Sequence, residues 1–178
     1  TDDEALHHLM ELNFFAMTRM CRAVLPSMRQ RGSGKIINIS SLGGLAGLPF
    51  QGAYSASKYA VEGYSEALRS EVLPFGISVA LVEPGDFQTK FTSSRQIVGA
   101  DSPYAVYGQR ALQRIEKDES SGKSPEVLAK LLCSLVSRRR LKARYGAGEL
   151  SQRLLIKSRF LMGDRLFLRL LRWYYMGI

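Results

Sequence analysis

The chain has 178 residues, of which 46% are hydrophobic, and a formal net charge of +9. This length supports one hydrophobic core, so we expect a single domain over residues 1–178. Residues 138–178 hold 11 Lys and Arg against two Asp and Glu, whereas residues 1–137 are neutral overall, which argues against a nucleic-acid-binding core.

The cysteines and histidines lack the spacing of metal ligands. Cys21 and Cys133 lie far apart within apolar helical patterns, so we expect two reduced core thiols. His7 and His8 are adjacent and without further ligands, which predicts a solvated helix face and no metal site. No run of 18 apolar residues and no secretory leader is visible, which argues against a membrane-spanning helix and favours a cytoplasmic location.

A long helix is predicted at the start of the chain. Residues 1–4 have the spacing of a capping box, and the apolar positions over residues 6–24 predict a helix buried over much of its circumference. Gly32 or Gly34 ends it. Asn13 interrupts the apolar pattern, and an Asn in such a place usually satisfies a neighbouring backbone group.

A buried strand is predicted at residues 36–40, where a β-branched run ends in hydroxyls. Ser41 would follow the carboxyl end of this strand, where ligands bind in open α/β sheets. Gly43, Gly44 and Gly47 come next. No helix begins at the spacing of a phosphate cradle, so these glycines more simply allow tight turns.

The helix predicted at residues 51–73 carries Tyr54 and Lys58, which leave the same face at i and i+4. A neighbouring ammonium favours phenolate over phenol and moves the pKa of the phenol towards neutrality, as general acid–base catalysis requires. A lone Tyr-x-x-x-Lys is common. With Ser41 close by, however, the group suits proton transfer to or from an alcohol or carbonyl oxygen.

Three further elements are predicted. Residues 77–83 form a second buried strand, and the Pro84-Gly85 that follows would by itself be only a turn. Ser124 as N-cap begins another helix, with proline at its first position. Residues 145–148 form a short last strand.

With these motifs in register, the chain resembles the catalytic half of the short-chain dehydrogenase/reductase family over roughly residues 1–146. The resemblance implies an α/β fold, a Rossmann-type doubly wound parallel sheet, and an oxidoreductase that uses NAD or NADP. The family's first βαβ unit, which holds the pyrophosphate and reads the adenosine ribose, has no counterpart in these residues.

The resemblance also implies roles for single residues. Tyr54 would transfer the proton, Ser41 would orient the substrate oxygen, and Lys58 would lower the pKa of the tyrosine and bind the nicotinamide ribose. Asn13 would hold a water that links the lysine to solvent. The full sets implied are Asn13, Ser41, Tyr54 and Lys58 for catalysis, and Tyr54, Lys58, Pro84, Gly85 and Thr89 for cofactor binding.

The family places its substrate lid at residues 87–124, and its first two helices here usually build a dimer interface, so we expect a homo-oligomer, a dimer or a tetramer. The loop Ser41–Phe50 and the basic tail are similar to those of members that act on steroid, retinoid or other lipid-like alcohols. Within the loop, Leu48, Pro49 and Phe50 either face this small-molecule substrate or only pack the loop.

Residues 150–178 form a basic amphipathic C-terminal extension. Such a segment can lie on an anionic membrane surface, or it can pack on its own domain or on a partner subunit with its Arg stems along apolar surface.

The expected function is therefore NAD(P)-dependent interconversion of an alcohol and a carbonyl. The alternative is a catalytically inactive fragment that serves as a structural or dimerisation module, because the first βαβ unit is missing and only two or three strands would form a sheet with one bare edge. A membrane-surface interaction protein is a third hypothesis, which depends on the C-terminal extension alone.

Overall fold

The centre of the fold is a parallel sheet of three strands in the order β1–β2–β3. The computed structural model describes residues 2–89 and 101–178, apart from the side chain of Phe160. The strands cover Gly34–Ile39 (β1), Ile77–Pro84 (β2) and Arg144–Ala147 (β3). β1 pairs with β2 along its whole length, whereas β3 pairs only with the end of β2. The three predicted strands and the parallel sheet are confirmed.

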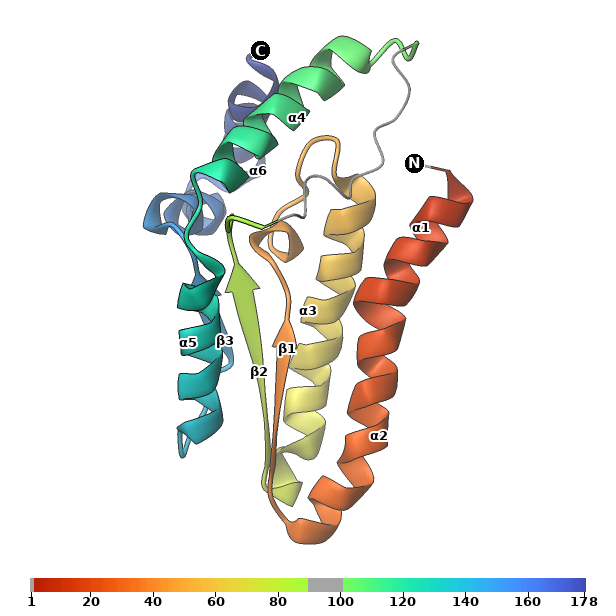
Figure 1. Cartoon of the computed structure of the whole chain (residues 1–178), viewed down its shortest axis with the longest axis vertical. Helices are drawn as coiled ribbons and strands as arrows, with labels where there is room; N and C mark the ends of the chain where they lie inside the picture. The colour runs from red at the N-terminus through yellow and green to blue at the C-terminus, as the bar shows by residue number, and fades with distance from the viewer. Residues whose placement is uncertain (1, 90–100) are drawn as a thin grey trace.

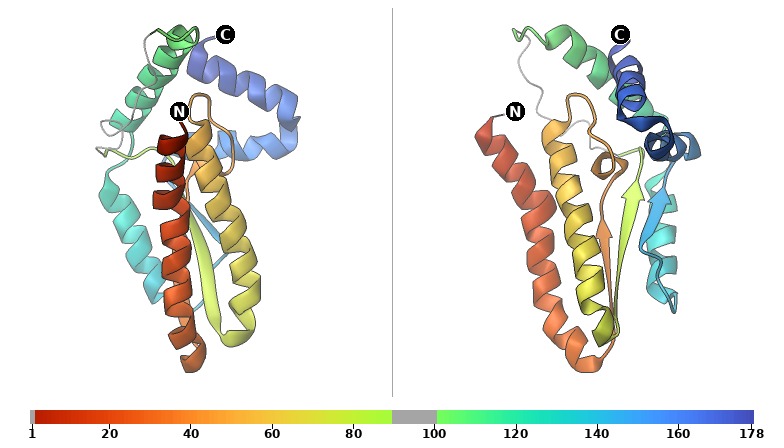
Figure 2. Two further views of the ribbon diagram at one scale, coloured as in Figure 1. Left: turned by 90° about the vertical axis from the view of Figure 1, so that its right-hand side faces the viewer. Right: turned by 180° about the vertical axis from the view of Figure 1, so that it is seen from behind.

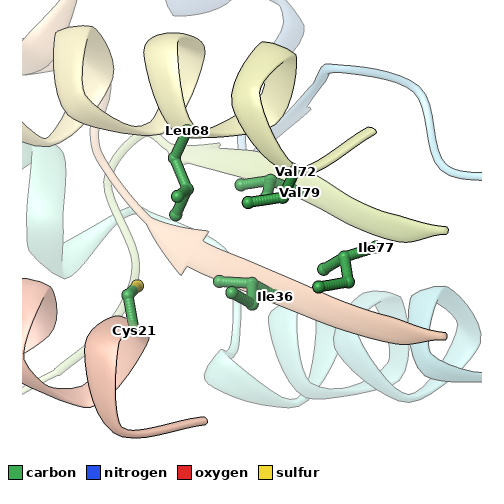
Figure 3. Close-up of a cluster of buried hydrophobic side chains, with 6 residues drawn as sticks. All are labelled: Cys21, Ile36, Leu68, Val72, Ile77 and Val79. Atoms are coloured by element: carbon green, nitrogen blue, oxygen red, sulfur yellow. The ribbon is translucent and has the colours of Figure 1, made fainter. Parts of the chain in front are cut away.

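β2 is buried on both faces of the sheet, as expected of a strand made almost entirely of apolar residues. Ile77 and Val79 pack with the helices on one face (Figure 3). Ala80 and Val82 alternate with them and pack on the opposite face. Figure 1 shows this division, with α2 and α3 on one side of the strands and α5 on the other.

The chain begins with one helical run that has three parts: α1 (Asp3–Met10), a π-helical turn η1 (Glu11–Phe15) and α2 (Ala16–Arg31). The N-cap is Asp2, whose carboxylate accepts a hydrogen bond from the Ala5 N–H at 2.7 Å. Gly32 ends the run in the left-handed conformation, as predicted.

The prediction that this run is largely buried was wrong. Cys21 is its only fully buried residue among those described, while Leu12 and Met20 are 64% and 66% exposed. The apolar pattern was real, but several of its residues lie on a side of the run that no part of residues 2–89 and 101–178 covers.

The second long helix, α3 (Gly52–Val72), lies against the sheet beside α2 (Figure 2). A short 3₁₀ turn, η2 (Leu42–Gly44), precedes it and another, η3 (Leu73–Phe75), ends it before Gly76. Glu62 of α3 is only 5% exposed, and it is ion-paired with Arg144 of β3 at 3.2 Å.

The region between β2 and β3 contains two helices, α4 (Ala105–Ser120) and α5 (Pro125–Ser137). Ser124 caps α5 as predicted. α4 was not predicted, because its polar sequence gave no clear period. Cys133, expected in the core, lies exposed on α5, whereas Cys21 is buried.

The last helix, α6 (Leu150–Met176), is broken at Gly163, whose backbone is not helical (φ 75°, ψ 161°). One face of α6 packs on its own domain, where Ile156, Phe167 and Leu171 form a core with Leu42 and Ala46. α4 and α6 lie together beyond the carboxyl ends of the strands (Figure 1). Within the part of the chain that the structure describes, no helix is both long enough and apolar enough to cross a membrane.

Candidate active site

A cavity of about 360 Å³ lies at the carboxyl ends of β1 and β2. Its walls come from four parts of the chain: the segment after β1 with the first turns of α3, the end of β2 with the segment after it, the facing sides of α4 and α6, and Leu128 of α5. Ligand cavities of open α/β sheets form at this end, because successive parallel strands deliver their following loops to the same edge.

Ser41 is held at the entrance of η2. Its hydroxyl oxygen accepts a hydrogen bond from the Gly43 N–H at 3.1 Å, so the side chain caps the 3₁₀ turn. A hydroxyl that accepts from the backbone keeps its own O–H for donation. Ser41 can therefore donate to an oxygen inside the cavity.

Two glycines allow the η2 loop to approach α3. A Cβ at Gly43 would lie 3.1 Å from the Tyr54 ring, and a Cβ at Gly44 would lie 2.7 Å from the Ser40 hydroxyl and 3.0 Å from the main-chain oxygen of Lys58. The close approach brings Ser41 and Tyr54 to the same wall. The tight loop expected from the glycines is therefore present, and its use is close packing of backbone against helix.

Tyr54 and Lys58 lie one turn apart on α3, and both line the cavity. The Lys58 ammonium is 5.9 Å from the centre of the Tyr54 ring and donates a hydrogen bond to the main-chain oxygen of Ile39 at 3.2 Å. Burial lowers the pKa of Lys58 below its ordinary value. The hydrogen bond anchors the ammonium at the end of β1, two residues before Ser41.

Asn13 approaches this group from outside the cavity. Its side-chain amide donates to the Ser57 hydroxyl at 3.0 Å, and Ser57 in turn donates to the Tyr54 main-chain oxygen at 2.7 Å. The π-helical turn η1 contains Asn13 at its centre, and π-turns interrupt the regular backbone pattern of a helix. Asn13 thus contacts α3, the helix that carries Tyr54 and Lys58, but it does not line the cavity.

The last residue of β2, Pro84, and the segment after it form another wall, to which Gly85 and Thr89 belong. α6 fixes this segment: the Gln152 side chain accepts from the Asp86 N–H at 3.2 Å and donates to the Asp86 carboxylate at 2.6 Å. A Cβ at Gly85 would lie 2.5 Å from the same Gln152 side chain. Glycine at 85 therefore allows α6 to close on the segment.

α4 and α6 are joined over the cavity by one polar cluster. Tyr174 of α6 donates to the Asp118 carboxylate at 2.8 Å and accepts from Arg114, whose guanidinium lies 4.0 Å from the centre of the tyrosine ring. Apolar residues of both helices complete the lining, together with the buried Glu119. They are Ile115, Leu155, Ile156, Leu171 and Tyr175.

The structure brings six of the seven predicted site residues to one cavity, namely Ser41, Tyr54, Lys58, Pro84, Gly85 and Thr89. Leu48 also lines it, whereas Phe50 lies against Gly108 of α4. Sequence reasoning missed Asp86 and the wall from α4 and α6. Asp86 directly follows the Pro-Gly pair and could have been suspected, but Gln152 and Tyr174 carry no local signal.

Comparison with known proteins shows the family. The model of the short chain dehydrogenase family matches residues 1–97, so the chain belongs to that family. It is 48% identical over 176 residues to 3-ketodihydrosphingosine reductase of Bacteroides thetaiotaomicron, covering 97% of this chain and 65% of that protein. It is 34% identical over 156 residues to retinol dehydrogenase 8 of Bos taurus, covering 79% of this chain and 50% of that protein.

The fold has close counterparts among solved structures. A short-chain dehydrogenase from Streptomyces avermitilis superposes with a TM-score of 0.74 at 31% identity, covering 97% of this chain and 61% of that one. The 178 residues thus span half to two thirds of the length of these relatives, and they correspond to a Rossmann-type fold without part of its sheet.

Proposed function

We propose that the chain is the catalytic portion of an NAD(P)-dependent oxidoreductase that interconverts an alcohol and a carbonyl. The observation that carries this proposal is the convergence of Ser41, Tyr54, Lys58 and the Pro84–Thr89 segment on one cavity. Its relatives support the proposal, since they are named dehydrogenases and reductases.

In this proposal Tyr54 gives a proton to the substrate oxygen in reduction and takes it in oxidation. Ser41 donates a hydrogen bond to the same oxygen and orients it. The Lys58 ammonium beside the ring favours the phenolate. Asn13 supports α3 through Ser57, and a water held near it would connect Lys58 to solvent. Proton transfer of this kind contributes about 10²–10⁴-fold to a rate.

NAD or NADP would supply or accept the hydride at the carbinol carbon. The cavity fits the nicotinamide end of such a molecule, because the ammonium of Lys58 and the hydroxyl of Thr89 are suitable partners for ribose hydroxyls and the carboxamide. Two structures of the same fold contain such cofactors: a short chain dehydrogenase from Burkholderia cenocepacia is in complex with NADP, and one from Burkholderia phymatum is in complex with NAD.

We further propose a lipid-like small-molecule substrate. The walls from α4 and α6 are mainly apolar, and relatives are named for 3-ketodihydrosphingosine, retinol and 17-beta-hydroxysteroid. A homo-oligomer belongs to the same proposal: the uncovered apolar residues Leu12, Phe15 and Met20 lie on the helical run that would face a second copy. A cytoplasmic location stays a prediction.

The first test is titration of NADH and NADPH into the purified chain, followed by nicotinamide fluorescence. We expect binding that weakens in Lys58→Ala, and reduction of a long-chain ketone that falls about 10²–10⁴-fold in Tyr54→Phe but not in Tyr107→Phe, a tyrosine of α4 outside the cavity. A folded chain that binds neither nucleotide would support the alternative, an inactive structural or dimerisation module.

A further inference from the structure

The outer face of α6 beyond Gly163 carries a stripe of arginines. Arg165, Arg169 and Arg172 are spaced i, i+4 and i+7, so they share one side of the helix, and all three are exposed. Within the described part of the chain, no carboxylate lies within 4.0 Å of any of them. Asp164, the acidic residue next to the stripe, pairs with Arg159 instead at 2.7 Å.

Large apolar side chains flank this stripe and are just as exposed. Leu166 is 49%, Leu168 56% and Trp173 66% exposed, and Leu161, which precedes the break at Gly163, is 92% exposed. Burial in water-soluble proteins normally removes such side chains from solvent, whereas Leu and Trp beside arginine are typical of helices that lie in a membrane interface. The outer face of α6 therefore combines positive charge with exposed apolar side chains, and both features favour contact with a membrane interface.

The end of α6 and α4 form a shallow groove of about 390 Å³ beside Trp173. Arg110, Arg114 and Lys117 line it, and no Asp or Glu is among its described lining residues. Arg110 is bonded to the Met176 main-chain oxygen at 3.3 Å. The groove thus extends the positive surface of α6 on to α4 and ends at the exposed indole.

We propose that this surface, the α6 outer face with the Trp173 groove, docks on an anionic lipid bilayer. Charge complementarity selects this occupant: unpaired arginines attract anionic headgroups, Arg stems and Leu side chains reach the acyl boundary, and a Trp favours the interface. The inference extends the proposed lipid-like substrate but does not require it.

Docking would also place the cavity next to the bilayer. Leu171 and Tyr175 line the cavity from the inner side of the same helix turns that carry Arg172 and Trp173 outside. One helix, about 10–12 Å across with its side chains, therefore separates the docked surface from the cavity. An apolar substrate could pass between α4 and α6 without crossing bulk water.

Trp173 is the only tryptophan of the chain, so its emission reports this surface directly. The experiment mixes the full chain with vesicles of phosphatidylglycerol, of phosphatidylcholine, or with inorganic phosphate alone, at low and high salt. We expect a blue shift and quenching by brominated lipid with phosphatidylglycerol only, lost at high salt because exposed charges are screened. No nucleotide or substrate is needed, so the result is separate from the test of the oxidoreductase.

Two triple variants each replace three arginines by glutamate, one on the proposed docking surface and one away from it, so that both change the net charge by the same amount. In R165E/R169E/R172E we expect vesicle affinity to fall more than about tenfold. R138E/R139E/R140E changes three exposed arginines that follow α5, at the other end of the sheet (Figure 1), and should bind nearly as the wild type. Far-ultraviolet circular dichroism checks that each variant is folded, and brominated-lipid quenching of the wild type gives an answer without any variant.

Three results would overturn the proposal. The first is no binding or quenching with phosphatidylglycerol at low salt. The second is an equal loss in both triple variants, which would show a response to net charge alone. The third is a fluorescence change reproduced by inorganic phosphate, which would assign the groove to a free anion.

Discussion

The Asn13 amide donates to the Ser57 hydroxyl at 3.0 Å, and this hydrogen bond joins the π-turn of the first helical run to the turn of α3 that carries Tyr54 and Lys58. Because Ser57 is fully buried and also donates to the Tyr54 main-chain oxygen, the two contacts form a chain from Asn13 to the proposed proton donor.

Removal of this link should be measurable as a coupled loss of stability. Asn13→Ala and Ser57→Ala should each reduce the free energy of unfolding by about 1 kcal/mol, with a coupling of similar size in the double mutant. Urea unfolding of the wild type, the two single mutants and the double mutant measures this coupling free energy. Additive losses would contradict the link, and Ser70→Ala, an exposed serine of α3, is the control.

Gly44→Ala should reduce the stability of the fold and disturb the cavity wall that holds Ser41 and Tyr54. The new Cβ would clash with the Ser40 hydroxyl and the main-chain oxygen of Lys58. Overpacking of this kind typically lowers the free energy of unfolding by about 1–3 kcal/mol. Gly47→Ala is the matched control, since no atom lies within 4 Å of its Cβ position. The thermal unfolding midpoint of Gly44→Ala should be clearly lower than that of Gly47→Ala. Equal midpoints would show that the η2 loop adjusts to the added methyl group without cost.

The charged group at the end of β2 gives a pH prediction. Burial is the main cause that raises the pKa of Glu83, and the nearby Glu62 carboxylate raises it further. The Arg144 guanidinium, 3.2 Å away, acts in the opposite direction and lowers this pKa. A raised pKa in the folded state means stability that is present below about pH 4.5 and is lost as the pH rises through the folded value. Glu83→Gln removes this pH-dependent loss of stability, because glutamine does not ionise.

The stability of Glu83→Gln relative to the wild type should therefore become more favourable as the pH rises above about 4.5. Thermal unfolding across pH 4–8 measures the difference. Glu66→Gln is the control, because this carboxylate contacts the same guanidinium at 3.1 Å but is 68% exposed. A difference that does not change with pH would contradict the assignment.

The α4–α6 contact predicts an effect on substrate binding. Tyr174→Phe keeps the ring beside Arg114 but removes the hydroxyl that bridges Arg114 and Asp118. We expect KM for the ketone substrate to rise about 3–10-fold, corresponding to one hydrogen bond, with kcat little changed. Steady-state kinetics separate the two, and Tyr104→Phe, 69% exposed before α4, is the control. A fall in kcat alone would place Tyr174 in the chemistry instead.

Much of this architecture could be predicted because it follows from local patterns. Apolar runs identified β1 and β2, Gly32 marked the end of α2, and the spacing of Tyr54 and Lys58 placed them on one face. Each of these signals depends on residues within a few positions of one another.

The features that were missed depend on contacts between distant residues. Glu62 became buried because Arg144, 82 residues away, pairs with it, and Gln152 enters the site only because α6 folds back over Gly85. The π-turn at Asn13 and the helix α4 likewise follow from tertiary packing that overrides weak local preference.

The edge position of β1 has a consequence for handling the chain. β1 pairs only with β2 among the described residues, so the other side of its backbone offers unpaired N–H and C=O groups before the Ile39 oxygen, which accepts from Lys58. Ile39 is also 40% exposed. A flat apolar edge of this kind recruits strands from other molecules. Yield and shelf life of residues 1–178 should therefore depend steeply on protein concentration, and a peptide strand that covers this edge should act as a solubilising agent.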